Sequence, residues 1–316
     1  MIKIRIAEAH DFSEEVIKHL RQFADVDLAP CRQSDLKTIF QEYDVFWFRL
    51  GFRIGPDLMD VKMRCKIVAT PVTGIDHIDE KACVAHGLKI ICLRGEQDFL
   101  REVRATAEMT IALTFAVMRN ITDAEQDVKK GLWRRDLFRG HEIYKKTVGI
   151  IGLGRLGAIT AEYFKALGAE VIGYDIRLDN SPSYVAIEES IDELVKKADI
   201  ISIHVKYDES THHLINEETF KSFTNKKWLI NSSRGGIVDE CAMLKAFKED
   251  RIAGAALDVV QDEHLFDKNN ALLKYAQTHR NLIIVPHIGG NTYESFEKTE
   301  WFIAKKILEE VQAWQS

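Results

Sequence analysis

The chain has 316 residues, of which 46% are hydrophobic and 29% are charged, a composition typical of a globular protein long enough to bury two cores. Its 43 lysines and arginines against 49 aspartates and glutamates leave a formal net charge of −6, without a long run of like charge. These features argue against a protein that binds nucleic acid or an acidic membrane surface, and they predict two domains.

The N-terminal segment, residues 1–6, alternates apolar and basic residues as a strand does, and it lacks the apolar segment of a signal peptide. The most apolar segment, residues 105–118, is shorter than the roughly 20 residues that a membrane span needs, and we expect a buried helix there. The five cysteines are odd in number, and none forms a Cys-x-x-Cys pair. We therefore expect a cytoplasmic protein with reduced thiols, no disulfide framework and no metal site.

Short apolar segments alternate with helical patterns along the chain, which predicts parallel α/β units. The first series of predicted strands comprises residues 2–7, 45–48, 67–69 and 89–92, and a long helix is expected at about residues 101–121. The second series comprises residues 148–151, 171–174, 200–205, 228–231, 253–257 and 282–285. This second series is long enough to form a doubly wound sheet by itself.

The last predicted helix, residues 295–314, follows no strand of its own, and we expect it to return to the first domain. The predicted fold class is therefore α/β, with two Rossmann-like doubly wound parallel-sheet domains of which the first is discontinuous. The predicted boundaries are 1–98 plus 290–316 for a substrate-binding domain and 99–289 for a cofactor domain.

A glycine-rich loop joins the strand that ends at Ile151 to the helix that follows. It has the pattern of a dinucleotide-binding turn, formed by Gly152, Leu153, Gly154, Arg155, Leu156 and Gly157. The first glycine permits the tight turn, the second lets the backbone approach a diphosphate, and the third lets the helix pack on the strand. The helix N-terminus then offers free amides to the phosphates.

An acidic residue, Asp175, ends the next predicted strand, 18 residues beyond Gly157. That spacing is typical of the carboxylate that accepts a ribose hydroxyl, and it favours NAD over NADP because a carboxylate repels a 2′-phosphate. Arg177 is a nearby cation that would weaken this discrimination. The alternative is that the glycines only shape a strand-to-helix turn and that Asp175 is a solvated carboxylate.

Three polar segments follow later predicted strands, at the sheet edge where ligands bind in open α/β folds: residues 231–236, 257–263 and 286–290. Hydride transfer between a nicotinamide and a hydroxyl carbon needs a proton acceptor for the alcohol and a cation for the substrate anion. Histidine and arginine, the natural choices for these roles, both occur in these segments.

Taken together, these motifs resemble those of the D-isomer-specific 2-hydroxyacid dehydrogenase family, including its phosphoglycerate dehydrogenases, over nearly the whole chain. The segments that carry the resemblance are residues 73–79, 105–108, 147–157, 215–217, 229–239, 254–259 and 286–290. The resemblance implies an NAD-dependent enzyme that interconverts a D-2-hydroxyacid and a 2-ketoacid by closing two domains on the substrate.

The resemblance also implies roles for individual residues. Arg234 would bind the substrate carboxylate and carbonyl, His287 would act as the acid/base, and Glu263 would support the histidine. Ser233, Asp258, His204 and Thr110 are expected to contribute to cofactor binding. In the first domain, the backbone around Val72, Thr73 and Gly74 is expected to hold the substrate carboxylate opposite Arg234, and Arg49 matches an arginine near the substrate of phosphoglycerate dehydrogenases.

The sequence departs from the family pattern at three positions. Met109 stands where many members have histidine, and His264 stands where proline usually follows the catalytic glutamate. Gly51 replaces a second basic residue that some phosphoglycerate dehydrogenases carry, which weakens the case for a phosphorylated substrate. Compensation by the nearby Arg94, Arg101 and Arg104 remains an alternative to their being exposed structural cations.

The main alternative function is an NAD-sensing protein that resembles the family's transcriptional corepressors. Formate dehydrogenase chemistry is disfavoured because those relatives carry glutamine at the position of Glu263, whereas phosphite oxidation remains open. The resemblance further implies a homodimer in which the helix at 105–118 packs across the two-fold axis. The C-terminal regulatory domain of some phosphoglycerate dehydrogenases is expected to be absent.

Overall fold

The computed structural model describes residues 1–179 and 181–314, which form two compact units. Unit 1 comprises Met1–Val103 and the chain from Asn291 onward, and unit 2 comprises Arg104–Gly290. Each unit has its own parallel sheet. The predicted fold class, two parallel α/β domains with a discontinuous first domain, is thereby confirmed. No helix in the described part of the chain is long and apolar enough to cross a membrane.

The sheet of unit 1 has five parallel strands in the order β2-β1-β3-β4-β5. They are β1 (Ile2–Ile6), β2 (Ala24–Asp27), β3 (Val45–Trp47), β4 (Ile67–Ala69) and β5 (Lys89–Ile91). Only β2 was not predicted. It is an edge strand with two aspartates, a residue type that strands disfavour, so its sequence gives little strand signal.

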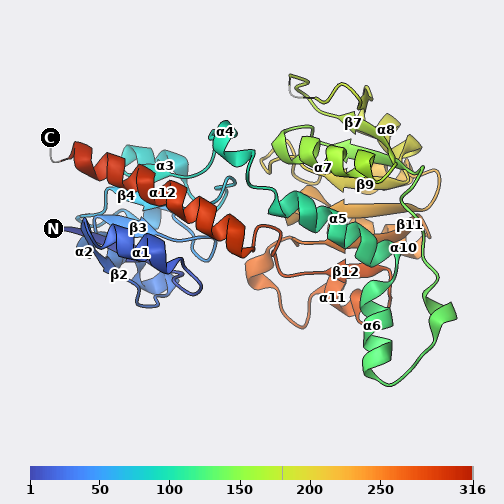
Figure 1. Ribbon diagram of the computed structural model, residues 1–316, viewed down its shortest axis with the longest axis horizontal. Helices are drawn as coiled ribbons and strands as arrows, with labels where there is room; N and C mark the ends of the chain where they lie inside the picture. The colour runs from blue at the N-terminus through green and yellow to red at the C-terminus, as the bar shows by residue number, and fades with distance from the viewer. Residues whose placement is uncertain (180, 315–316) are drawn as a thin grey trace. The chain divides into compact units, whose positions relative to one another are not determined.

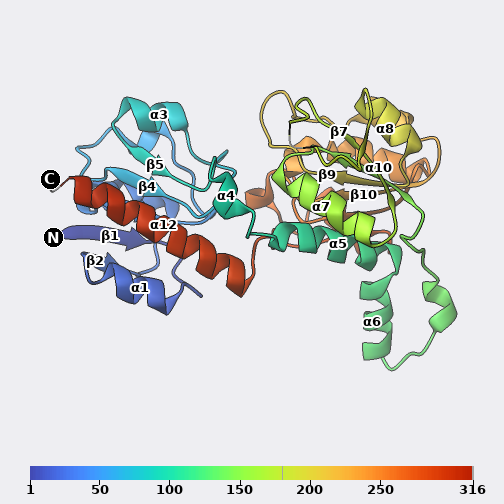
Figure 2. The same ribbon diagram turned by 45° about the horizontal axis from the view of Figure 1, so that its top comes forward.

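Helices cover both faces of this sheet. They are α1 (Glu14–Leu20), α2 (Leu36–Glu42), α3 (Glu80–Ala85), α4 (Gln97–Leu100) and α12 (Tyr293–Ala313). Helices α1 and α12 lie side by side on one face, and their apolar side chains share a core with those of β1, β3 and β4 (Figures 1 and 2). Side chains of α2 and α3 pack with Phe46, Phe48 and Val68 in a separate core. The prediction that the last helix returns to the first domain is confirmed.

The sheet of unit 2 has seven parallel strands in the order β12-β11-β10-β9-β6-β7-β8. They are β6 (Thr147–Ile151), β7 (Glu170–Tyr174), β8 (Ala186–Ile187), β9 (Ile200–Ile203), β10 (Lys227–Asn231), β11 (Ile252–Leu257) and β12 (Leu282–Ile284). The chain runs outward from β6 to β8 and then crosses back to β9 on the other side of β6. This reversal, beside the carboxyl ends of β6 and β9, is where dinucleotides bind in doubly wound sheets.

Unit 2 has helices on both faces of its sheet: α5 (Ala105–Met118) and α7 (Arg155–Ala166) share one core, while α8 (Ile191–Lys197), α9 (Glu217–Lys221), α10 (Glu240–Lys248) and α11 (Ala271–Ala276) contribute to another. Helix α5 is shorter than predicted because the backbone turns left-handed at Asn120 (φ 53°), after which α6 (Ile121–Lys129) begins. Helix α6 and the segment after it extend away from the sheet of unit 2 (Figures 1 and 2).

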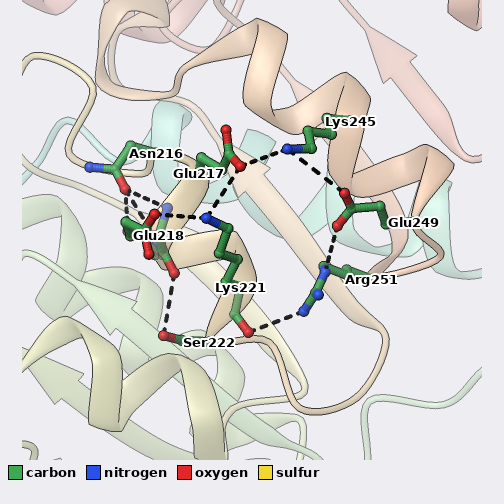
Figure 3. Close-up of polar contacts among 9 residues, drawn as sticks. Asn216, Glu217, Glu218, Lys221, Ser222, Lys245, Glu249 and Arg251 are labelled. Carbon is green, nitrogen blue, oxygen red and sulfur yellow. Dashed lines mark hydrogen bonds and ion pairs between the residues drawn. The ribbon is translucent and has the colours of Figure 1, made fainter.

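An exposed ion-pair network joins α9, α10 and the start of β11 (Figure 3). Glu217 contacts both Lys221 and Lys245, at 3.3 and 2.6 Å. Arg251 donates hydrogen bonds to Glu249 and to the backbone oxygen of Lys221. Each exposed pair contributes only about 0–1 kcal/mol, so the network adds little to the free energy of folding.

Candidate active site

The glycine-rich loop has the backbone that a dinucleotide-binding turn requires. Gly152 has a φ of +92°, a conformation that side chains rarely adopt, and a Cβ at Gly157 would overlap the carbonyl oxygen of Gly152. At Gly154, by contrast, a Cβ would meet no heavy atom within 4 Å. This open space lies at the N-terminus of α7, so a diphosphate fits against the backbone amides there.

Asp175 lies directly after β7 and is tied to the glycine-rich loop. One carboxylate oxygen accepts a hydrogen bond from the Leu153 amide at 2.7 Å, and the other accepts one from the Arg177 amide at 2.9 Å. The chain thus places a carboxylate beside the diphosphate loop, where an adenosine ribose would need an acceptor. Arg155 and Leu156 form the first turn of α7 and are partly buried.

His204 follows β9 and supports the glycine loop from the side of the sheet reversal. Its backbone amide donates to the Ile151 oxygen at 2.7 Å, and its carbonyl group lies 2.8 Å from where a Cβ on Gly152 would stand. The ring nitrogen Nε2 lies 2.7 Å from the hydroxyl oxygen of the fully buried Ser202. Burial lowers the pKa of His204 to about 4, so the ring is neutral at pH 7.

We expect the His204 ring to titrate near pH 4 in an NMR titration, with the resonance identified by its absence from His204→Gln. The reference pKa is about 6.5, so the unfolded chain takes up this proton first as the pH falls. Stability is therefore lost between about pH 6.5 and 4, by up to about 3 kcal/mol, and His204→Gln should lose less over that range in denaturant unfolding. A midpoint near 6.5 would contradict this assignment.

The loop after β10 is held by side-chain hydrogen bonds and carries Arg234. The side chain of Asn231, 1% exposed, accepts from the Ser233 amide and donates to the Arg234 carbonyl, both at 3.0 Å. The Ser233 hydroxyl donates to the carbonyl of Ile203 at 2.8 Å. These contacts fix the backbone from which the Arg234 guanidinium extends, and Nη1 of that guanidinium donates to the Ser233 carbonyl at 2.9 Å.

Thr110 and Ser232 connect this loop to α5. Their hydroxyl oxygens lie 2.7 Å apart, and the Thr110 hydroxyl also donates to the Thr106 carbonyl. Both residues are buried, and the contact of Thr110 with the loop is this pairing with the Ser232 hydroxyl. We therefore expect any contribution of Thr110 to cofactor binding to act through this loop.

His287 and Glu263, which are 24 residues apart in the sequence, form a hydrogen-bonded pair. The Nδ1 atom of His287 lies 2.9 and 3.0 Å from the two carboxylate oxygens of Glu263. The imidazole side chain is 22% exposed, and the carboxylate is 45% exposed. The carboxylate fixes Nδ1 as the protonated nitrogen, so Nε2 is the atom that can exchange a proton with a substrate.

Asp258 anchors the loop that carries His287. Its carboxylate accepts hydrogen bonds from the amides of Ile288 and Gly289 at 2.7 and 2.8 Å, and its backbone oxygen accepts one from the His287 amide at 2.8 Å. The side chain is buried, which raises the pKa of Asp258, while the two amides favour the charged form. Asp258, predicted as a cofactor residue, thus positions the His287 backbone.

Sequence reasoning did not single out Asn231, Ser202 and Ser232 as site residues. A signal for them existed, because each is a polar residue within or directly after a buried apolar strand. Such positions are usually apolar, and a buried polar side chain there requires hydrogen-bond partners. Which partners these would be depends on loops distant in the sequence.

The predicted substrate residues Arg49, Val72, Thr73 and Gly74 belong to unit 1. Arg49 follows β3, and its guanidinium contacts Glu300 at 2.7 Å and the ring of Phe296 at 4.0 Å. Val72 and Thr73 follow β4. In the described part of the chain, the amide nitrogens of Val72 and Thr73 have no hydrogen-bond acceptor, so both are available to an anion.

Comparison with known proteins places this geometry in context. Residues 111–289 match the model of the NAD-binding domain of the D-isomer specific 2-hydroxyacid dehydrogenases. The D-3-phosphoglycerate dehydrogenase of Methanocaldococcus jannaschii is 32% identical over 97% of the chain, which spans 57% of that relative's length. The glyoxylate reductase of Thermofilum pendens is 34% identical over 89% of the chain and 82% of the relative.

Among solved structures, the D-lactate dehydrogenase of Aquifex aeolicus, complexed with NAD and lactic acid, is 26% identical. The match covers 98% of this chain and 96% of that dehydrogenase, with a TM-score of 0.80. The agreement extends over both units and includes the discontinuous first one. The loop at 152–157 and the residues around His287 thus lie within a fold whose neighbours include an NAD complex.

Proposed function

Because this chain belongs to the D-isomer specific 2-hydroxyacid dehydrogenase family, we propose that it interconverts a D-2-hydroxyacid and the corresponding 2-ketoacid with NAD(H). The observation that carries the proposal is the His287–Glu263 pair, which is held in the same unit as the glycine-rich loop and the Arg234 loop. A carboxylate–imidazole pair supplies proton transfer, and an arginine fork binds a carboxylate.

NAD would bind with its diphosphate at residues 152–157 and its adenosine ribose near Asp175, and when bound it supplies the hydride acceptor or donor. Gly154 leaves the space that a diphosphate needs, and the amides at the start of α7 favour its charge. Asp175 accepts from two backbone amides, so it is held where a ribose hydroxyl can donate to it.

During ketoacid reduction, Arg234 would orient the substrate carboxylate and polarise the carbonyl oxygen. His287 would donate its Nε2 proton to that oxygen, and in the reverse direction it would take the proton from the hydroxyl group. Glu263 stabilises the imidazolium through Nδ1 and fixes its orientation. Asp258 and Asn231 act as positioning residues for the two loops.

The direct test follows NADH consumption by the full-length chain with a panel of 2-ketoacids that includes glyoxylate, pyruvate and hydroxypyruvate. We expect turnover of at least one of them and, where pyruvate or hydroxypyruvate is reduced, a D-configured product. NADH binding is measured separately by fluorescence. Binding without turnover of any panel member would contradict the proposal and favour the NAD-sensing alternative.

We also propose that the chain forms a homodimer and acts in the cytoplasm. The five cysteines are free thiols, which suits a reducing compartment. Helix α5 covers the sheet of its own unit, whereas the segment after it exposes large apolar side chains: Ile121, Val128, Leu132, Trp133, Leu137 and Tyr144. So many exposed large apolar side chains within one segment suit an interaction surface.

We expect light scattering to give twice the monomer mass for the wild type and a lower mass for Trp133→Glu. Trp133 is 86% exposed, so burying it against a second copy would remove a large apolar area from water, whereas a glutamate there would be costly to bury. The control is a tag attached at the N-terminus, at Met1–Lys3, because Met1 is also exposed but lies outside the segment. This change should leave the dimer intact. A dimer that persists unchanged in Trp133→Glu would contradict the assignment of this surface.

A further inference from the structure

We infer that the substrate is an unphosphorylated 2-hydroxyacid or 2-ketoacid, because carboxylates of unit 1 neutralise the cations at the edge of its sheet where a ligand would bind. This inference rests on the proposed function and narrows its substrate class. In parallel α/β sheets ligands bind at the carboxyl ends of the strands. In unit 1 the charged residues that directly follow those ends include Glu8 after β1, Arg49 after β3 and Arg94 after β5.

The Arg49 guanidinium is committed to contacts within unit 1. Its Nη2 atom donates to Glu300 at 2.7 Å, and its Nη1 atom donates to the His10 carbonyl at 3.1 Å. The plane lies over the Phe296 ring, and the side chain is only 16% exposed. The third nitrogen, Nε, has no hydrogen-bond partner in the described part of the chain but is buried, so little of the guanidinium remains for a phosphate group.

Burial raises the pKa of Glu300, whereas its hydrogen bonds and the Arg49 charge favour the ionised form that pairs with this arginine. The side chain is 1% exposed, and its second oxygen accepts a hydrogen bond from the Ser13 amide at 2.9 Å. Both oxygens thus act as acceptors, as those of a carboxylate do. A buried ion pair of this kind is expensive to separate, because each partner would be left as an uncompensated charge.

A second carboxylate, Glu8, lies beside the Arg49 backbone. One of its oxygens accepts hydrogen bonds from the amides of Arg49 and Gly51, at 2.5 and 3.3 Å. A Cβ on Gly51 would stand 2.9 Å from the other oxygen, so a longer side chain at this position would require Glu8 to move. Glu8 therefore adds negative charge where a second basic residue would otherwise stand.

The remaining cations near this edge give a phosphate little support. Both terminal nitrogens of Arg94 donate to Glu80, which occupies the face that would grip an anion. Arg53 is exposed on the loop after β3, and its backbone is held by Gln33. A phosphate adds a charge of about −1.5 to −2 at pH 7, whereas a 2-ketoacid without phosphate carries only its carboxylate.

The decisive comparison uses hydroxypyruvate and 3-phosphohydroxypyruvate, which differ only by the phosphate. We expect the wild type to show a kcat/KM at least about tenfold higher for hydroxypyruvate, since one uncompensated charge interaction in a partly exposed site is worth more than a factor of ten. If the enzyme reduces neither compound, both are compared as inhibitors of the reduction of the ketoacid that it does accept. A preference for the phosphorylated compound would overturn the inference while leaving the proposed function intact.

The variant Glu300→Gln tests the cause. Glutamine keeps the shape but removes the charge that neutralises Arg49, so the ratio of phosphorylated to unphosphorylated kcat/KM should rise about tenfold. Glu310→Gln is the matched control, because Glu310 lies on the same helix but pairs with Lys89 at the opposite end of β5. The ratio of phosphorylated to unphosphorylated kcat/KM in Glu310→Gln should equal that of the wild type.

Should Glu300→Gln fail to fold, Glu8→Gln provides the same test, since its side-chain oxygen can still accept from the two amides. A ratio that stays at the wild-type value in the folded variants would overturn the inference. If the wild type reduced none of the 2-ketoacids, the proposed function itself would be contradicted. Failure of the inference and failure of the proposed function are therefore distinguishable.

Discussion

Replacing His287 by asparagine is expected to lower kcat by about 10²- to 10⁴-fold, the range that a positioned proton donor typically contributes. The Nδ1 atom of His287 is bound to Glu263, so only Nε2 can exchange a proton with the substrate, and asparagine has no equivalent group. Asparagine is the suitable replacement because His287 has a φ of +53°, a left-handed conformation that asparagine tolerates and alanine does not.

Steady-state kinetics with NADH and the best ketoacid would measure this loss, and NADH fluorescence would check that cofactor binding is retained. Glu263→Gln serves as a graded comparison, since a neutral amide still accepts from Nδ1 but stabilises the imidazolium less. We expect its kcat to lie between those of the wild type and His287→Asn. Full activity in His287→Asn would rule out this histidine as the acid/base.

Replacing Arg234 by lysine is expected to lower kcat/KM by roughly 10- to 10²-fold, because lysine can form only one of the two parallel hydrogen bonds of a guanidinium and each charge-assisted bond is worth about 1.5–3 kcal/mol. The loop itself should remain in place, since Asn231 binds backbone groups and not the Arg234 side chain. The lost interaction is made in the transition state, so kcat should fall as well as KM rise.

Arg251→Lys provides the control for this substitution. It makes the same change in the exposed network of Figure 3, and there the expected effect on kcat/KM is less than twofold. Thermal unfolding of both variants would separate loss of function from loss of stability. An Arg234→Lys variant with wild-type kcat/KM would exclude a bidentate role for this arginine.

Much of the cofactor site was predictable because it is local. The glycine-rich loop, its flanking strand and helix, and Asp175 all lie between residues 147 and 175, and each glycine has a steric reason that the pattern alone suggests. The edge strand β2 was missed because it has only two apolar residues, which alternate with two aspartates.

The contacts that position the proposed catalytic and substrate-binding groups were less predictable because they join distant segments. Asp258 binds amides 30 and 31 residues away, and Glu300 binds Arg49 across 251 residues. No local periodicity indicates such a pair, and the substrate contact predicted for Arg49 rested on the resemblance to phosphoglycerate dehydrogenases. Only the folded structure shows that the Arg49 guanidinium already binds a carboxylate of the same chain, that of Glu300.

The discontinuity of unit 1 has a consequence for folding during synthesis. Ile303, Ala304 and Ile307 of α12 complete the core that β1, β3 and β4 begin, so this core stays open until α12 has left the ribosome. Translation of the about 190 intervening residues takes about 10 to 40 s at 5–20 residues per second. Unit 2 is contiguous and can fold in that interval, whereas the first part of unit 1 waits with an apolar sheet face that only α1 partly covers. The nascent chain would therefore be most vulnerable to aggregation and most dependent on chaperones through its N-terminal hundred residues.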